Sequence, residues 1–172
     1  MNRRGFLIAS AATLAGGAAA LALHREGEIE SVQALLARLE SWRGLALKSQ
    51  TAWSPAQTLN HLAQRVEYSM TGYPEAKPPL FQRTAGRAAF EVFAYTGAMR
   101  HSLTEPIPGA PALAADGDPE AGLARLCAAL TQFSAHQGSL APHFAFGPLS
   151  HAEYAAAHVL HVENHLQQLG PA

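Results

Sequence analysis

The sequence predicts an all-α fold, an up-and-down four-helix bundle with an additional helix and long loops. Apolar residues recur at steps of three and four in several stretches, which is the spacing of one helix face. Helix start and stop signals bracket these stretches, and no stretch alternates with the period of a strand. The 172 residues, 48% of them apolar, suit one domain with a core of its own.

The composition excludes several classes of protein. The 12 Lys and Arg residues are balanced by 13 Asp and Glu residues, and the net charge is −1. A nucleic-acid binder needs a basic surface that neutralises phosphates, so we expect no nucleic-acid partner. Cys127 is the only cysteine, which excludes a disulfide framework and a Cys-based zinc site. The expected partner is a small-molecule ligand or substrate, and a homodimer is also open.

The first residues have the pattern of an export signal. Arg3 and Arg4 precede a mildly apolar, uncharged stretch that ends in an A-x-A pattern at residues 20–22. The paired arginines resemble the twin-arginine export motif. We therefore expect a signal peptide over residues 1–22, one helical domain over residues 23–172, and a periplasmic or otherwise exported protein.

The alternative for this segment is an N-terminal membrane anchor. The uncharged run over residues 6–23 is shorter than the roughly 20 apolar residues that a span needs. Its Ala, Gly, Ser and Thr content makes it weakly hydrophobic. We therefore expect no stable membrane span once the signal is removed.

Two helices are expected in the first half of the domain. The first ends near Gly44, and its apolar face is Ile29, Val32, Leu35, Leu36, Leu39 and Trp42. In the second, Ser54 can cap the helix, Pro55 suits the first helical position, and Gln57 completes a capping box. The buried face of this second helix is expected to be Ala56, Leu59, Leu62, Ala63 and Val66.

A third helix and a long loop follow. The helix is expected over residues 80–96, with an apolar face of Ala85, Ala89, Val92 and Phe93. Gly86 weakens its middle and Gly97 marks its end. Three prolines forbid regular structure in residues 101–117. A loop of this length is either a wall or lid of a functional site or a surface connection between bundle helices.

The fourth helix opens at Asp118, and its apolar side is Leu123, Leu126, Leu130 and Phe133. A second loop contains His143 among aromatic neighbours. The last helix starts at Ser150, where Glu153 completes a second capping box. We expect this helix to end near Leu169, before the glycine and proline that follow.

The last helix carries polar aromatic side chains along one face, at spacings of three and four: His151, Tyr154, His158, His161 and His165. His161 and His165 stand one turn apart, so two imidazoles can reach one metal ion. A third ligand must come from another helix, and His61 lies beside the apolar face of the second. The alternative is that these histidines are hydrogen-bonded or solvated residues that bind no metal.

These residues resemble the DinB-like superfamily. The run WSPAQTLNHLAQ, which contains His61, and the run HVENHLQQLG, which begins at His161, are similar to its second-helix and last-helix motifs. The runs VEYSM, EPIPGAP and PHFAFGPLS resemble one bacterial branch, described as domain of unknown function 1569. The resemblance covers residues 29–169. It implies a four-helix bundle whose metal site takes one histidine from the second helix and two from the last.

Carried over residue by residue, the resemblance implies that the metal ligands are His61, His161 and His165. Many relatives have another histidine just before the final ligand, where this chain has Asn164. Three imidazoles suit Zn²⁺, Ni²⁺ or Fe²⁺ and leave one position open for water or substrate. Candidates for the pocket, or for positioning the ligands, are His158, Tyr154, Asn164, His101 and His143. His158 is also an alternative ligand.

The predicted function is that of an exported metal-binding protein of unknown specific activity, acting as a metal-dependent hydrolase or transferase. Relatives in the superfamily include thiol-dependent transferases and isomerases. The alternative is a non-enzymatic binder of metal or of a small ligand. Glu67 and Glu163 are expected to point away from the ligands, so the sequence identifies no general base and no catalytic residue. Cys127 is expected to be a core residue.

Overall fold

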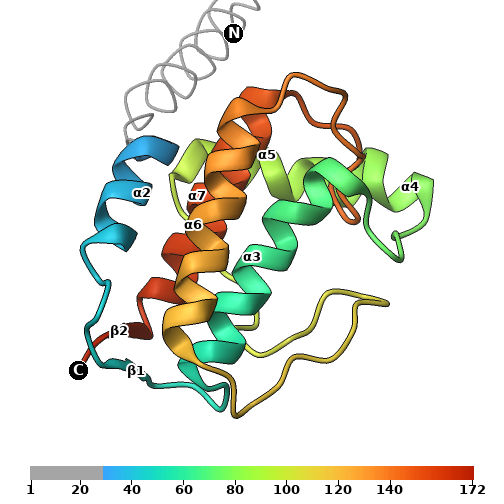
Figure 1. The fold of residues 1–172 in the computed structure, drawn as a ribbon. Coiled ribbons are helices and arrows are strands. Elements are labelled where there is room, and N and C mark those ends of the chain that lie inside the picture. Colours follow the sequence, from blue (N-terminus) through green and yellow to red (C-terminus); the bar gives the residue numbers. More distant parts are fainter. Residues whose placement is uncertain (1–28) are drawn as a thin grey trace, which may run out of the picture.

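The computed structural model describes residues 29–172, which form a bundle of helices and one short two-stranded sheet (Figure 1). The helices are α2 (Val32–Glu40), α3 (Pro55–Thr71), α4 (Pro79–Phe81), the π-helical turn η1 (Gln82–Gly86), α5 (Arg87–Thr96), α6 (Pro119–Ala135) and α7 (His151–Leu166). The strands are β1 (Leu47–Ser49) and β2 (Leu169–Pro171). This confirms the predicted helical fold class. The signal expected over residues 1–22 lies outside the described residues.

Both predicted capping boxes are present. In α3 the Ser54 hydroxyl accepts from the Gln57 amide (3.2 Å), and the Gln57 side chain accepts from the Ser54 amide (3.1 Å). Ser150 and Glu153 make the same reciprocal pair at the start of α7. Each box satisfies amides that the first turn of a helix leaves unpaired. The start of both helices, and thus the position of every later residue on them, is determined locally.

Helices α3 and α6 lie side by side (Figure 1) and approach closely at Gly122. A Cβ there would lie 3.1 Å from Leu59 Cβ and 3.2 Å from Asn60 Nδ2, so glycine allows this approach without displacement. Arg125 of α6 donates to both carboxylate oxygens of Glu67 on α3, at 2.9 and 2.7 Å. The core around these helices includes Leu35, Leu39, Leu62, Leu123, Leu126, Leu130 and Phe133.

The predicted third helix is a continuous run of α4, η1 and α5, but its buried face differs from the prediction. Ala85 is exposed and Val92 is 57% exposed, whereas Gly86 and Phe90 are buried. The reason is the π-helical turn over Gln82–Gly86, which adds a residue to one turn and so shifts the phase of the apolar face. The expectation that Ala85 and Val92 face the core is wrong.

Gly86 packs against the backbone of the loop that carries His143. A Cβ built on Gly86 would overlap the carbonyl oxygen of Ala145. We expect Gly86→Ala to lower the free energy of unfolding by about 1–3 kcal/mol, because the loop must be displaced. Thermal unfolding beside Gly170→Ala measures this, since a Cβ on Gly170 meets nothing within 4 Å. Equal melting temperatures for the two variants would contradict the close contact.

A short antiparallel ribbon joins the end of the chain to the segment before α3. Leu47 pairs with Pro171, and Ser49 pairs with Leu169. The expected helix end near Leu169 is therefore wrong, because α7 ends at Leu166 and Leu169 starts a strand. Strands of three residues are too short to show alternation, and these two lie far apart in the sequence, so no local pattern predicts them.

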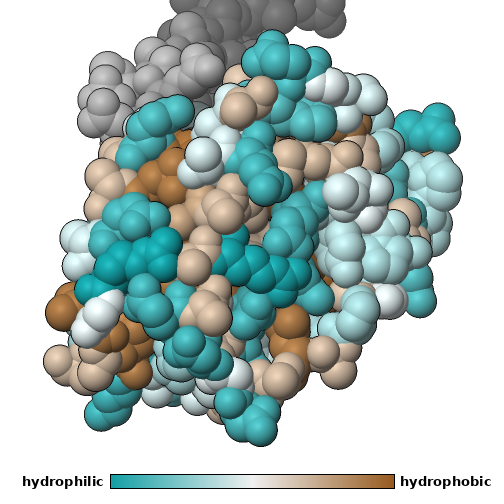
Figure 2. Space-filling model, in the orientation of Figure 1, coloured by the Kyte–Doolittle hydropathy of each residue, from teal (hydrophilic) through white to brown (hydrophobic). Residues whose placement is uncertain are grey.

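The surface of the described part mixes residue types. On the face shown in Figure 2, hydrophilic residues lie among small groups of hydrophobic ones. Large apolar side chains that are exposed include Leu45, Leu80, Phe81 and Val92. Within residues 29–172, no helix has the length and apolar character to cross a membrane.

Candidate metal centre

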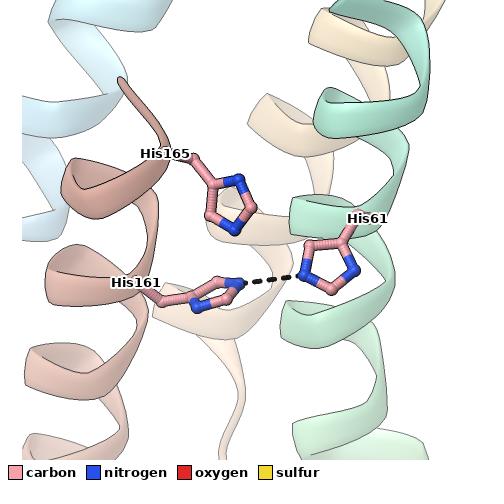
Figure 3. Close-up of side chains that lie close together, drawn as sticks. All are labelled: His61, His161 and His165. Atoms are coloured by element: carbon pink, nitrogen blue, oxygen red, sulfur yellow. Dashed lines mark hydrogen bonds between the residues drawn. The ribbon is translucent and has the colours of Figure 1, made fainter. Parts of the chain in front are cut away.

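Three buried histidines from two helices meet inside the bundle. His61 lies on α3, and His161 and His165 lie one turn apart on α7 (Figure 3). One ring nitrogen of each lies within 4.8 Å of the others, and Nε2 of His161 is 3.3 Å from Nε2 of His61. Their exposed fractions are only 3%, 1% and 2%. The structure thus brings together the three residues that the sequence identified as candidate ligands.

The donor atoms of this group fit a divalent cation. Nε2 of His165 is buried and has no hydrogen-bond partner. A buried polar atom without a partner lowers the stability of a fold by about 1–3 kcal/mol, so most such atoms are satisfied. A Zn²⁺, Ni²⁺ or Fe²⁺ ion held between the three rings would accept this lone pair, and imidazole nitrogen is a donor that all three ions take.

Burial keeps the three imidazoles neutral. Desolvation lowers the pKa of His61 to about 2 and the pKa of His165 to about 3, and it lowers the pKa of His161 well below its ordinary value. Repulsion from Arg65 acts in the same direction on all three. Only a neutral imidazole has a lone pair for a metal ion. The rings therefore hold the protonation state that metal binding needs at neutral pH.

His101 orients His161 through a directional chain of hydrogen bonds. Nδ1 of His101 lies 2.6 Å from the carbonyl oxygen of Ser102, which can only accept, so Nδ1 carries the proton. Nε2 of His101 therefore accepts from Nδ1 of His161, at 2.7 Å. This leaves the unprotonated Nε2 of His161 facing His61. The hydrogen bond selects the tautomer that a metal ligand requires.

A cavity of about 210 Å³ opens onto this group. Its lining includes His61, His161 and two of the predicted pocket residues, His101 and His143. The loop between α5 and α6 forms one wall, and the loop before α7 forms another, through Met99, Ile107, Phe144 and Phe146. The long proline-rich loop is therefore a wall of the site. Pockets for drug-sized ligands measure about 300–1,000 Å³, so this one suits a smaller molecule.

The other predicted pocket residues, Tyr154, His158 and Asn164, lie on α7 away from this lining. The Tyr154 hydroxyl donates to the carbonyl of Ala141 at 2.7 Å, and Nε2 of His158 lies 3.2 Å from the Ser69 hydroxyl. Asn164 lines a different cavity, and its buried Nδ2 has no partner. His158 and Tyr154 thus stabilise the packing between α7 and its neighbours.

The carboxylates nearest the ligands in sequence are engaged elsewhere. Glu163 pairs with Arg38 of α2, and Glu67 pairs with Arg125 of α6 at 2.7 Å. Both therefore point away from the three histidines, as the helix geometry predicts. Among the described residues that line the cavity, Glu105 is the one with a carboxylate, and it is exposed.

Arg65 is a residue of this site that the sequence analysis does not predict. It follows His61 by one turn of α3, lines the same cavity, and is only 8% exposed. A search for apolar faces passes over it, because arginine is rarely buried. The signal that identifies it is the i,i+4 spacing from His61, which places both side chains on one face of the helix.

Buried histidines make the stability of the fold depend on pH. Burial lowers the pKa of His158 to about 3, whereas the unfolded chain titrates near its ordinary value of 6.5. The unfolded state binds more protons below pH 6.5, so stability is full above that pH and is lost as the pH falls toward 3. We expect His158→Leu to reduce this loss by about 1.4 kcal/mol per pH unit. Urea unfolding of metal-free protein from pH 7 to 4 measures the slope, and equal slopes would contradict the prediction.

The family described as Protein of unknown function (DUF1569) matches residues 22–172. No curated protein and no solved structure matches significantly. The matched range contains all three histidines, and their buried group is consistent with a DinB-like fold. The chain therefore belongs to the DUF1569 family.

Proposed function

We propose that the protein binds one divalent metal ion through His61, His161 and His165 and uses it in a hydrolase or transferase reaction on a small molecule. The observation that carries this proposal is the buried Nε2 of His165. It lacks a partner within a group of three neutral imidazoles at the edge of a cavity. A bundle that needed these histidines only for packing would gain stability by satisfying or removing that nitrogen.

The cavity supports a small-molecule substrate, because two of the proposed ligands line it. His61 and His161 both line it, so a bound molecule can approach the metal position. His61, His161 and His165 would hold the divalent ion, and the bound ion would supply Lewis acidity toward a substrate oxygen or a nucleophile. Phe93, Met99 and Ile107 give the cavity an apolar wall, and charge interactions are stronger in apolar surroundings than in water.

A non-enzymatic binder of metal or of a small ligand is the second candidate. The observation that favours it is the lack of a buried carboxylate in the described lining, since Glu105 is exposed. A general base must lie within hydrogen-bond reach of the proton that it removes. His101 does not supply this base in the observed arrangement, because its Nε2 already accepts from His161.

The two candidates are distinguished by titrating metal-free full-length chain with Zn²⁺ and then assaying small esters, amides and thiol acceptors. The hydrolase or transferase proposal expects one equivalent of zinc and zinc-dependent turnover that His165→Ala abolishes. His151→Ala, on the same helix but outside the histidine group, is the matched control and should retain both. One bound equivalent without turnover supports the metal binder. No bound zinc contradicts the metal-dependent enzyme and the metal binder, and leaves only a binder of a small ligand.

A further inference from the structure

Arg65 carries a positive charge into the interior, and none of the ion pairs within residues 29–172 involves it. Its side chain lines the cavity and is 8% exposed. Within residues 29–172, the ion pairs of the other buried or half-buried arginines involve glutamates, but none involves Arg65. A buried charge without an opposite charge is costly and is normally paired. Arg65 is therefore suited to bind an anion that enters the cavity.

The contact between Arg65 and His143 does not satisfy the guanidinium. Its NH2 group lies 2.8 Å from Nε2 of His143. Nδ1 of His143, however, accepts from the backbone amides of Ala145 and Phe146, both at 3.1 Å. A neutral imidazole has one acceptor nitrogen, and the amides of Ala145 and Phe146 compete with Arg65 for it. His143 thus offers the guanidinium a shared neutral acceptor and no negative charge, and an anion would supply that charge.

The rest of the cavity limits the size of such an anion and favours an apolar character in its uncharged part. Its volume of about 210 Å³ admits a small organic molecule. The other charged residues of the lining, Lys77 and Glu105, are exposed, and its apolar residues include Phe93, Met99 and Phe146. The ligand therefore has a compact apolar body and one anionic end.

We propose that the cavity binds a small monocarboxylate, whose carboxylate is held by Arg65 while its body lies beside the three-histidine group. A planar guanidinium matches a carboxylate with two parallel hydrogen bonds, and one buried positive charge balances one negative charge. That this monocarboxylate is a substrate rests on the proposed metal function. The contact with Arg65 itself needs no metal.

A purely structural role for Arg65 leads to different results. Its guanidinium also lies 5.2 Å from the centre of the Phe144 ring, so it could serve to hold that loop. In that case Arg65→Met would lower the melting temperature. If Arg65 is kept for an anion, the neutral methionine relieves an uncompensated charge, and the melting temperature of the free protein stays equal or rises.

The test measures binding of butyrate and benzoate to the full-length chain by calorimetry, in metal-free and zinc-loaded forms, beside butyramide and benzamide. We expect both acids to bind more tightly than their amides in both forms, and Arg65→Met to weaken the acids by about 10- to 100-fold. The affinity of Arg65→Lys for the acids should lie between that of the parent and that of Arg65→Met. Arg83→Met removes an exposed charge as the control and should bind like the parent.

Three results would overturn the assignment. These are acids that bind no better than amides, equal affinity in the parent and Arg65→Met, or tighter binding of inorganic phosphate than of either acid. The comparison of acid with amide in the parent needs no variant, so it holds even if Arg65→Met fails to fold. Failure of zinc binding with an intact Arg65-dependent effect would refute only the metal function. The reverse pattern would refute only the carboxylate site.

Discussion

His161→Ala is expected to weaken zinc binding by a factor of about 100 or more while the bundle stays folded. Structural zinc sites bind with about 10–16 kcal/mol from four ligands, or roughly 3 kcal/mol for each. Nε2 of His161 lies 3.3 Å from that of His61, so its loss removes a central donor of the group. The imidazole also borders a cavity, which gives the truncated site room to relax. Competition with a chromophoric zinc chelator measures the affinity.

His158→Leu is the matched control for this experiment. His158 lies one turn earlier on α7 and is equally buried, but it contacts Ser69 and not the three histidines. We expect parent-like zinc affinity for His158→Leu, and circular dichroism should show parent-like helicity for both variants. Retention of one tightly bound zinc by His161→Ala would remove His161 from the ligand set.

His101→Ala is expected to weaken zinc binding by about 10- to 100-fold, although His101 is not itself one of the three histidines. Its Nε2 accepts from Nδ1 of His161 at 2.7 Å and so holds the metal-binding tautomer in place. Without this acceptor, the His161 ring is free to turn or to place its proton on Nε2. Zinc affinity measured in the same competition assay tests this effect.

The positioning role of His101 also predicts a rescue. His101→Gln supplies an amide oxygen that can accept from His161, so it should recover part of the lost affinity. His136→Ala is the control, since His136 is half-buried outside the three-histidine group and its Nε2 lies 3.4 Å from the Ser139 carbonyl. Equal losses of zinc affinity in the alanine and glutamine variants would show that His101 acts through its size and not by accepting a hydrogen bond.

The helices that carry the histidines could be predicted because their signals are local. Ser54 with Gln57 and Ser150 with Glu153 determine where α3 and α7 begin, and helical spacing then places His161 and His165 on one face. The third candidate, His61, was identified by its place beside the apolar face of the second helix, and the family resemblance implied the same residue. The structure brings the three histidines together, although His61 lies on α3 and the other two lie on successive turns of α7.

The remaining features depend on contacts that no local pattern encodes. The π-helical turn before α5 shifts the apolar face, so Val92 is exposed and Phe90 is buried. The two strands pair only after α7 has brought the end of the chain back to Leu47. Arg65 is recognised as a site residue only when the loop with His143 closes over it. The cavity is therefore a product of tertiary packing.

Zinc K-edge X-ray absorption on the full-length chain loaded with one equivalent tests the three-histidine centre. We expect three imidazole nitrogens at about 2.0–2.1 Å, and a reduced imidazole contribution or loss of zinc in His165→Ala. His151→Ala should give the spectrum of the parent. A parent chain that retains no zinc, or zinc surrounded by carboxylate oxygen without imidazole, would contradict the three-histidine metal centre.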